Sequence, residues 1–462
     1  MPVPFSRSRV ALALTLVLIF SLGLHLAFRA PSRPKWTSYY PAAEKPVIQT
    51  SRFPCRDLAT VEDLVVVMRT GATEIQDKLP KHFQTTFQCF DNLLVFSDYE
   101  ELFQDYPVHD VLKNMNPDIV ASNPDFEIYR RLKAKGRSAL RPEELSGGAS
   151  FEGSKVGKIE NPGWKLDKWK FLPMIRESLD LRPEGWWFVF VESDSYVVWS
   201  NLLQWIKKLD PYDPHYYGSE NMIGFDVYAH GGSVFVLSRP AMEKVAKLYA
   251  EKPNYWHHYT AQHWAGDCIL GKALKAVDVD LTYSWPMFQG GHPEKMDFSQ
   301  PKAFTNEAMW CRPALSYHHL ASPEVERMWN LEQGWIRERL VAAAKENRKP
   351  FDNRQADILH HGEIFRKLVL PNITADRSEW NNLSPDLVVA GNHDYETCKR
   401  LCQDNADCLQ FSVGPPGCSI GTKFPELGQR WADYQSHWMN DRVDAWMARL
   451  EGCKGVEGWS VT

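Results

Sequence analysis

Short apolar runs separated by polar residues set the expected order of strands and helices in this chain. Residues 63–70 and 92–98 have the apolar, β-branched composition of buried strands, and residues 74–87 between them have helical spacing. A strand, a helix and a second strand in this order favour a parallel sheet that is covered by helices. The pattern therefore predicts an α/β fold.

The same kind of pattern continues to about residue 345. The further predicted features are a loop-bearing, irregular insertion at 109–160, a helix at 164–179, a strand at 186–192, a helix capped by Ser200, a strand at 233–237 that leads into a helix through Ser238 and Pro240, and a helix at 329–345. After that helix the pattern changes, and five of the nine cysteines lie in residues 386–462. We therefore expect a second, smaller domain there.

The strand at 186–192 runs into Ser193, Asp194 and Ser195. Residues two apart in a strand point to the same side, so Glu192 and Asp194 would present two carboxylates together. Open α/β folds bind ligands beyond the carboxyl ends of their strands, and paired carboxylates suit Mg²⁺ or Mn²⁺. The alternative is a solvated turn, in which Asp and Ser are common.

Four motifs in a fixed order favour the functional interpretation. They are Glu192-Ser-Asp-Ser-Tyr-Val197, His230-Gly-Gly-Ser-Val-Phe-Val-Leu-Ser238, Gly266-Asp-Cys-Ile-Leu-Gly271 and Ser316-Tyr-His-His319. Together they resemble the motifs of the Fringe and core 1 β1,3-galactosyltransferase group, glycosyltransferase family 31, over roughly residues 60–335. The resemblance implies a GT-A-type nucleotide-binding fold with a mostly parallel, mixed sheet.

The resemblance also implies a metal site and a catalytic base. Glu192, Asp194 and His318 would hold Mn²⁺ or Mg²⁺, with His319 as the alternative to His318. Asp267 would be the general base that takes the proton from the acceptor hydroxyl in an inverting displacement. The competing interpretation of Asp267 is a simple N-cap of the helix that follows it.

The remaining candidate site residues are assigned to the two substrates. Three residues that end the first two strands are expected at the donor: Arg69, Thr70 and Asp98. Ser193 is expected there too, because the family's acidic motif has its middle carboxylate at the position of Ser193. Gly231, Gly232 and Trp285 are expected at the acceptor, where absent side chains or an aromatic face would admit a sugar ring. Trp256 and Phe288 are further aromatic candidates for stacking.

The N-terminal sequence predicts a membrane anchor. Arginines at 7 and 9 precede an apolar run, which gives a cytosolic tail at 1–9, a transmembrane signal anchor at 10–29 and a proline-rich stem at 30–54. A cleaved signal peptide is the alternative. A glycosyltransferase domain at 55–345, a connector at 346–385 and a cysteine module at 386–462 would then lie in the Golgi lumen, in a single-pass type II membrane protein.

Cysteine spacing adds expectations for a lumenal chain. Cys398, Cys402, Cys408 and Cys418 resemble the PAN/Apple module, which implies pairs between Cys402 and Cys408 and between Cys398 and Cys418, in a small α+β domain; zinc is the rival use of these thiols. The other predicted pairs are Cys55 with Cys89 and Cys268 with Cys311, which leaves Cys453 unpaired. Asn372 and Asn382 match the pattern of glycosylation acceptors.

The sequence therefore predicts a metal-dependent, inverting hexosyltransferase that moves a sugar to a glycan or glycoprotein hydroxyl, and the resemblance implies a UDP-sugar donor and a β1,3 linkage. The net charge of −5 argues against a nucleic-acid partner. One alternative is a catalytically weakened binding protein, because Ser193 replaces a carboxylate. A metal phosphoesterase fits less well, because it needs more Asp and His ligands.

Overall fold

A computed structural model describes residues 52–146, 161–301, 308–352, 354–373, 376–451, 453 and 459. The predicted tail and anchor and nearly all of the stem lie outside the described residues. In the described part of the chain, no helix is long and apolar enough to cross a membrane.

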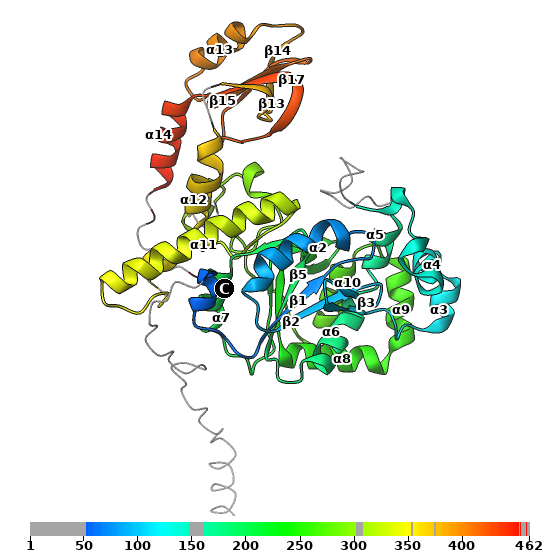
Figure 1. Cartoon of the computed structure of the whole chain (residues 1–462). Coiled ribbons are helices and arrows are strands. Elements are labelled where there is room, and N and C mark those ends of the chain that lie inside the picture. Colours follow the sequence, from blue (N-terminus) through cyan, green and yellow to red (C-terminus); the bar gives the residue numbers. More distant parts are fainter. Residues whose placement is uncertain are drawn as a thin grey trace, which may run out of the picture. The chain divides into compact units, whose positions relative to one another are not determined.

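An eight-stranded mixed sheet organises the larger part of the structure (Figure 1), in the order β11-β7-β10-β5-β1-β2-β4-β3. Its strands are β1 (Leu64–Arg69), β2 (Leu93–Ser97), β3 (Glu101–Phe103), β4 (Tyr106–Asp110), β5 (Trp187–Glu192), β7 (Tyr216–Gly218), β10 (Phe235–Ser238) and β11 (Thr282–Tyr283). The pairs β1–β2, β1–β5, β2–β4 and β7–β11 are parallel, whereas β10 is antiparallel to β5 and β7. The mostly parallel, mixed sheet predicted from the sequence is confirmed.

Helices cover both faces of this sheet. In Figure 1, α2 (Ile75–Gln84) and α11 (Ser322–Lys345) lie on one side of the strands, and α6 (Phe171–Leu181) and α8 (Arg239–Glu251) lie on the other. Helix α10 (Gly266–Lys275) packs against both α6 and α8. Every residue of β1 is buried. Burial from both sides explains why the strand sequences are continuously apolar rather than alternating.

Smaller elements connect these layers. They are β6 (Tyr196–Val197), β8 (Glu220–Ile223), β9 (Asp226–Ala229), β12 (Ser316–Tyr317), α3 (Pro117–Ser122), α4 (Glu127–Lys135), α5 (Pro162–Asp167), α7 (Trp199–Ile206) and α9 (Pro253–Gln262). Strand β12 pairs with β6, and this pairing brings the last predicted motif beside the turn that follows β5.

Two local predictions in this region are wrong. The insertion is not irregular in residues 109–146, because it contains α3 and α4. The three buried residues of α4, Ile128, Tyr129 and Leu132, stand among charged residues, so their helical pattern is weak in the sequence. Ser200 does not cap α7; it lies inside the helix, where its backbone N–H and hydroxyl both donate to the buried carboxylate of Glu332.

The C-terminal region forms a second, antiparallel sheet of five strands in the order β13-β17-β15-β16-β14. Its elements are β13 (Arg377–Asn381), β14 (Asp386–Ala390), β15 (Gln410–Gly414), β16 (Gly417–Gly421), β17 (Gln429–Trp438), α13 (Tyr395–Asp404) and α14 (Asn440–Leu450). The small α+β fold is thus as predicted. The sheet begins with β13, however, inside the range that the sequence assigns to the connector.

The rest of the predicted connector packs into the larger fold and is not a loose linker. The side chain of Asn201 in α7 donates to the carbonyl oxygens of Ala314 and Leu359, both at 2.7 Å, and accepts the N–H of Leu359 at 3.0 Å. His361, in α12 (His361–Ile364), is fully buried. Buried polar contacts of this kind fix the connector against the larger sheet domain.

Three of the predicted disulfides are present: Cys55–Cys89, Cys398–Cys418 and Cys402–Cys408. The predicted pair Cys268–Cys311 is wrong, because Cys311 bonds to Cys453. Cys268 is a free, buried thiol that packs against Tyr228 and Ala265 on the inner side of α10. Cys453 is therefore the partner that the sequence left unassigned.

The two predicted glycosylation positions differ in exposure. Asn372 is exposed. Asn382 is fully buried, and its amide nitrogen donates to the carbonyl oxygens of Phe411 and His437 at 3.0 and 3.2 Å. The prediction for Asn382 is therefore wrong in the folded chain, because a glycan on that nitrogen would displace both hydrogen bonds and has no path to solvent.

The buried His361 predicts a loss of stability in acid. Burial lowers the pKa of His361 to about 3, and its ring nitrogens bond to the Tyr317 hydroxyl at 2.6 Å and the Pro286 carbonyl at 2.8 Å. An unfolded histidine binds a proton below about pH 6.5, so between pH 6.5 and 3 the unfolded state binds more protons and stability falls as pH falls. At pH 5 the unprotonated His361 lowers the free energy of unfolding by about 2 kcal/mol relative to pH 7.

Urea unfolding at pH 7 and pH 5 measures this effect. The loss of unfolding free energy between the two pH values should be smaller by about 2 kcal/mol in His361→Gln than in the parent. The same substitution at His258, whose side chain is exposed, should leave the loss unchanged. Equal losses in the parent and His361→Gln would contradict the assignment of a neutral, buried imidazole.

Candidate active site

The turn after β5 brings two carboxylates to one histidine. β5 ends at Glu192, and the N–H of Ser195 bonds back to the Glu192 carbonyl at 3.0 Å, so Asp194 lies in a turn. His318 Nε2 lies 3.6 Å from Glu192 Oε2 and 3.2 Å from Asp194 Oδ1. The two acids therefore converge as predicted, but through the turn and not through the alternation of a strand.

The two glycines at 231 and 232 separate this cluster from Asp267. A Cβ on Gly232 would overlap the imidazole of His318, and one on Gly231 would lie 3.2 Å from Glu192 Oε1. The N–H of Gly231 donates to Asp267 Oδ2 at 2.9 Å, and the Gly232 carbonyl accepts the Ser195 hydroxyl at 2.7 Å. The turn needs glycine because side chains pack against it from both directions.

Ion pairs link the cluster to the ends of β1 and β2. Carboxylates and cations alternate along one chain of contacts: Asp98, Lys170, Asp167, Arg69, Glu192, His318, Asp194, Lys78 and Glu74. The five carboxylates and four cations of this series of ion pairs have a formal charge of −1 when His318 is protonated. In this series of ion pairs, a cation lies between each two successive carboxylates.

These contacts set the protonation of the cluster. Burial tends to raise the pKa of Glu192, but Arg69 and His318 outweigh it and hold that pKa at about 2. Burial acts likewise on Asp194, and Lys78 and His318 hold its pKa well below the usual range. Burial lowers the pKa of His318, yet the two carboxylates raise it to about 10. Without a bound cation the imidazole carries a proton that bridges the two acids.

The geometry fits a divalent cation. Asp194, His318 and His319 each offer a ligand atom, and these atoms lie within 4.8 Å of one another. Asp194 Oδ1 is buried with His318 Nε2 3.2 Å away, and the centroids of the His318 and His319 rings lie 3.8 Å apart. One carboxylate and imidazole nitrogens are a donor set that suits Mn²⁺ better than Mg²⁺. Glu192 stays a predicted ligand, with one of its oxygens bonded to Arg69.

Asp267 is not the N-cap of α10, and its role as the base stays a prediction. Ala265 is the N-cap of α10, and Asp267 stands in the first turn, where it accepts the N–H of Gly231. Burial raises the pKa of Asp267, although the N–H groups of Gly231 and Cys268 and the nearby His230 act in the opposite direction. A raised pKa makes the carboxylate a better proton acceptor near neutral pH.

The predicted donor residues lie around this cluster with their polar groups already engaged. Arg69 is bonded to Glu192 and Asp167 and stacks on the ring of Phe171. The Thr70 and Ser193 hydroxyls both donate to Glu74 Oε1, at 3.2 and 3.0 Å. Asp98 is fully buried and accepts the N–H of Ala72 at 2.8 Å. A role for the four at the donor stays a prediction.

Sequence reasoning missed Glu74 and Lys78. Glu74 bonds Ser193, so it supplies a carboxylate beside the position where Ser193 replaces the middle acid of the family motif. Lys78 is bonded to Glu74 at 2.8 Å and to Asp194 at 3.2 Å. Their spacing of four residues at the start of a predicted helix is the one pattern that could have indicated them, and such pairs are common on helix surfaces.

The predicted aromatic contacts with the acceptor are largely absent. Trp256 and Phe288 are buried in the core, so the suggestion that they stack on sugars is wrong. Trp285 is partly exposed, and its role at the acceptor stays a prediction. Gly231 and Gly232, in contrast, lie directly between His318 and Asp267.

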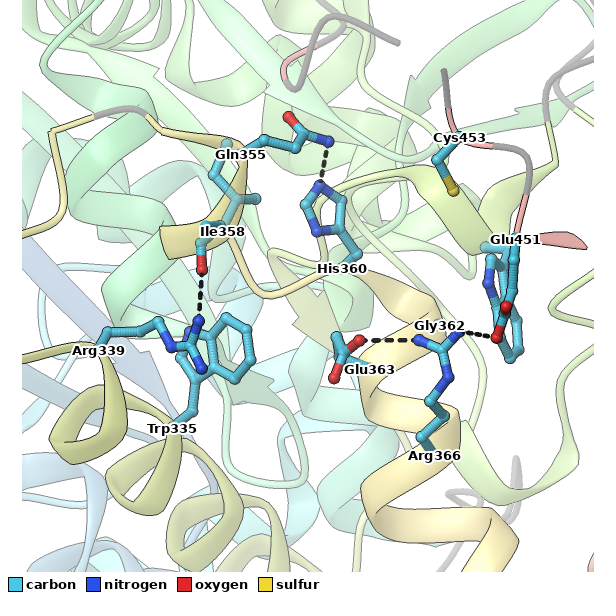
Figure 2. Close-up of a pocket in the computed structure, with 12 residues that line it drawn as sticks. Trp335, Arg339, Gln355, Ile358, His360, Gly362, Glu363, Arg366, Glu451 and Cys453 are labelled. Carbon is cyan, nitrogen blue, oxygen red and sulfur yellow. Dashed lines mark hydrogen bonds and ion pairs between the residues drawn. The ribbon is translucent and has the colours of Figure 1, made fainter. Parts of the chain in front are cut away.

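The larger of the two described cavities is not part of this site. Figure 2 shows this cavity of about 520 Å³, in which Arg366 bonds to Glu363 and Glu451. Its walls come from α11, the connector and the residues around Cys453. None of the predicted metal, donor or acceptor residues lines it.

Comparison with known proteins gives one family match, and it covers the segment that carries most of the candidate site residues. Residues 174–334 match the family model described as Fringe-like, a range that contains Glu192, Asp194, Gly231, Asp267 and His318. None of the curated proteins matches the chain. Among solved structures, the chain is similar to the crystal structure of a glycosyltransferase involved in the glycosylation of the major capsid of PBCV-1, at 12% identity over 55% of this chain and 94% of that one. The TM-score of 0.23 is too low for that likeness to carry an argument. Residues 174–334 are thus a Fringe-like domain, and the match supports a glycosyltransferase.

Proposed function

We propose that the protein is a metal-dependent, inverting glycosyltransferase that moves a sugar from a UDP-sugar to a hydroxyl of a glycan or glycoprotein. One observation carries the proposal: the Gly231-Gly232 turn holds the Asp194–His318 cluster on one side and the Asp267 carboxylate on the other. A metal-dependent, inverting transfer from a nucleotide-sugar needs both groups, a cation site for the diphosphate and a base for the acceptor.

The residues divide the reaction between them. Asp194 and His318, with His319 or Glu192, would hold Mn²⁺ or Mg²⁺, which when bound neutralises charge on the departing diphosphate. Asp267 takes the proton of the acceptor hydroxyl as that oxygen attacks the anomeric carbon. Attack in one step from the face opposite the diphosphate inverts the anomeric centre. Gly231 keeps the Asp267 carboxylate oriented through its N–H.

The finer parts of the proposal rest on the family resemblance. These are the UDP-sugar donor, the β1,3 linkage, the type II anchor at 10–29 in the Golgi membrane and the PAN/Apple character of the C-terminal module, which would bind protein or carbohydrate. A catalytically weakened binding protein is the second candidate, favoured by Ser193 in place of an acid. Glu74 weighs against that candidate, because it supplies a carboxylate beside Ser193.

Asp194→Asn should abolish the response to metal. Calorimetry of the parent with UDP should show binding that requires Mn²⁺, and transfer from a UDP-sugar should stop when the ion is chelated. Loss of the charged ligand should weaken Mn²⁺ binding and lower turnover at least about 100-fold. Asp91→Asn, at an exposed aspartate paired with Arg56, is the matched control. Parent-like Mn²⁺ binding by Asp194→Asn would remove Asp194 from the metal site.

Asp267→Asn should separate binding from chemistry. The amide oxygen can still accept the Gly231 N–H, so UDP and Mn²⁺ should bind with unchanged affinity. Removal of the base should lower kcat by about 10²–10⁴-fold. A variant that keeps the parent kcat would show that another group takes the proton. A parent that binds UDP and Mn²⁺ but transfers nothing to any acceptor would favour the binding-protein alternative.

Lys78→Met should strengthen metal binding. Lys78 Nζ lies 3.2 Å from Asp194 Oδ2 and therefore competes with a metal ion for that carboxylate. Removing this charge should lower the Mn²⁺ dissociation constant about tenfold or more, which corresponds to about 1.4 kcal/mol. Lys81→Met, in the same helix and paired with Glu326, should change nothing. Weaker Mn²⁺ binding in Lys78→Met would mean that the lysine orients Asp194 instead of competing for it.

A further inference from the structure

We propose that the acceptor is an oligosaccharide chain, bound along a strip of aromatic side chains that leads to Asp267. The strip consists of Tyr255, Tyr259, His263, Trp264 and Trp164, from α9, the residues just after it and α5 (Figure 1). This inference rests on the proposed function, since it names the substrate class that the base would serve.

A cavity forms the end of the strip nearest the base. It has a volume of about 280 Å³ and is lined by Pro124, Asp125, Trp164, Lys165, Lys168 and Trp264. The Trp164 and Trp264 rings lie nearly parallel, 16° apart, with their centroids separated by 6.4 Å. Trp264 is 59% exposed, which is unusual for so large an apolar side chain. An exposed aromatic pair beside charged groups is typical of a binding surface.

The strip continues along one face of α9. Tyr255 and Tyr259 are four residues apart, which places them on the same face of the helix, and His263 follows as the C-cap residue. The Tyr255 and Tyr259 rings stack at 6.4 Å, and the Tyr259 and His263 rings stack at 5.7 Å. Flat rings that recur with each helical turn, about every 5.4 Å, suit a repeating ligand better than a single small molecule.

The cavity is in direct contact with the elements that hold the base. Trp264 stands three residues before Asp267, and a Cβ on Gly266 would lie 2.7 Å from the Lys168 Cα, so α5 and the start of α10 touch through their backbones. Asp167, beside Lys168, bonds Arg69 and through it Glu192. The two segments that line the cavity are thus the ones that carry Asp267 and, through Asp167 and Arg69, contact Glu192.

The polar surroundings favour a carbohydrate over a protein partner. Lys168 Nζ pairs with Asp125 at 2.8 Å in the cavity wall, and Lys165 is exposed beside them. Sugar hydroxyls can bond to such charged groups while the apolar faces of the rings stack on indole or phenol. The exposed residues His258 and Gln262 interrupt the aromatic surface on α9. Exposed polar groups of this kind offer hydrogen-bond partners to the hydroxyls of a sugar.

Calorimetry on the full chain with defined sugars tests the proposal. The probes are mannohexaose, laminarihexaose and chitohexaose, with the matching disaccharides, each titrated with and without UDP and Mn²⁺. At least one hexasaccharide should bind at least ten times more tightly than its disaccharide. Trp264→Ala should weaken both by at least tenfold, whereas Tyr255→Ala should remove only the advantage of the hexasaccharide. Trp431→Ala, at a tryptophan in β17 that is 48% exposed, should change neither.

The outcomes separate this inference from the proposed function. UDP and Mn²⁺ should bind equally to the parent and to Trp264→Ala; if neither protein binds them, the proposed function fails, and the sugar titrations still test the strip. The strip is wrong if the parent binds no hexasaccharide, if Trp264→Ala binds as the parent does, or if Trp431→Ala abolishes binding instead. Transfer to unglycosylated peptides alone, with none to any hexasaccharide, would also overturn it.

Discussion

The candidate site depends on one constraint, the neutralisation of charges that the fold buries at the carboxyl ends of its central strands. Carboxylates and cations alternate from Asp98 at the end of β2 to Glu74 at the start of α2, and the chain passes through the end of β1 and the turn after β5. A buried charge without a partner costs several kcal/mol, so loss of one member leaves its neighbours uncompensated. The alternation therefore holds the ends of three strands in one arrangement. It also keeps Glu192 and Asp194 close together despite their like charge.

The Gly231-Gly232 turn couples this charged cluster to the proposed base. Because neither glycine has a side chain, His318 can pack against Gly232 while the N–H of the preceding Gly231 donates to Asp267. The metal-binding half and the proton-accepting half of the site thus share one short piece of backbone. Their electrostatic environments differ: cations hold the pKa of Glu192 and Asp194 low, whereas burial raises the pKa of Asp267. In the proposed reaction, the two acids with lowered pKa would hold the cation, and the acid with the raised pKa would accept the proton.

The C-terminal region is joined to the rest of the chain more firmly than an appended module requires. Asn201 bonds the predicted connector into the larger fold, and the Cys311–Cys453 disulfide closes a loop of 142 residues in sequence separation. The disulfide holds Cys453, three residues after α14, beside the segment that leads to β12, the strand that ends next to His318. A displacement of the C-terminal region would therefore also displace the segment that carries His318, a proposed metal ligand.

The sequence by itself determined the elements and motifs that local patterns encode. Apolar runs marked β1, β2 and β5, and the spacing of Cys398, Cys402, Cys408 and Cys418 allowed the local disulfides to be assigned through a family resemblance. Only the tertiary structure decided the partners of residues far apart in the chain: Cys453 for Cys311, Glu74 for Ser193, Lys78 for Asp194, and Trp164 beside Trp264. Contacts across a hundred residues leave no periodic trace, because they arise where strands and helices end side by side. A charged or aromatic residue on a helix has the same local pattern whether it faces solvent or the active site.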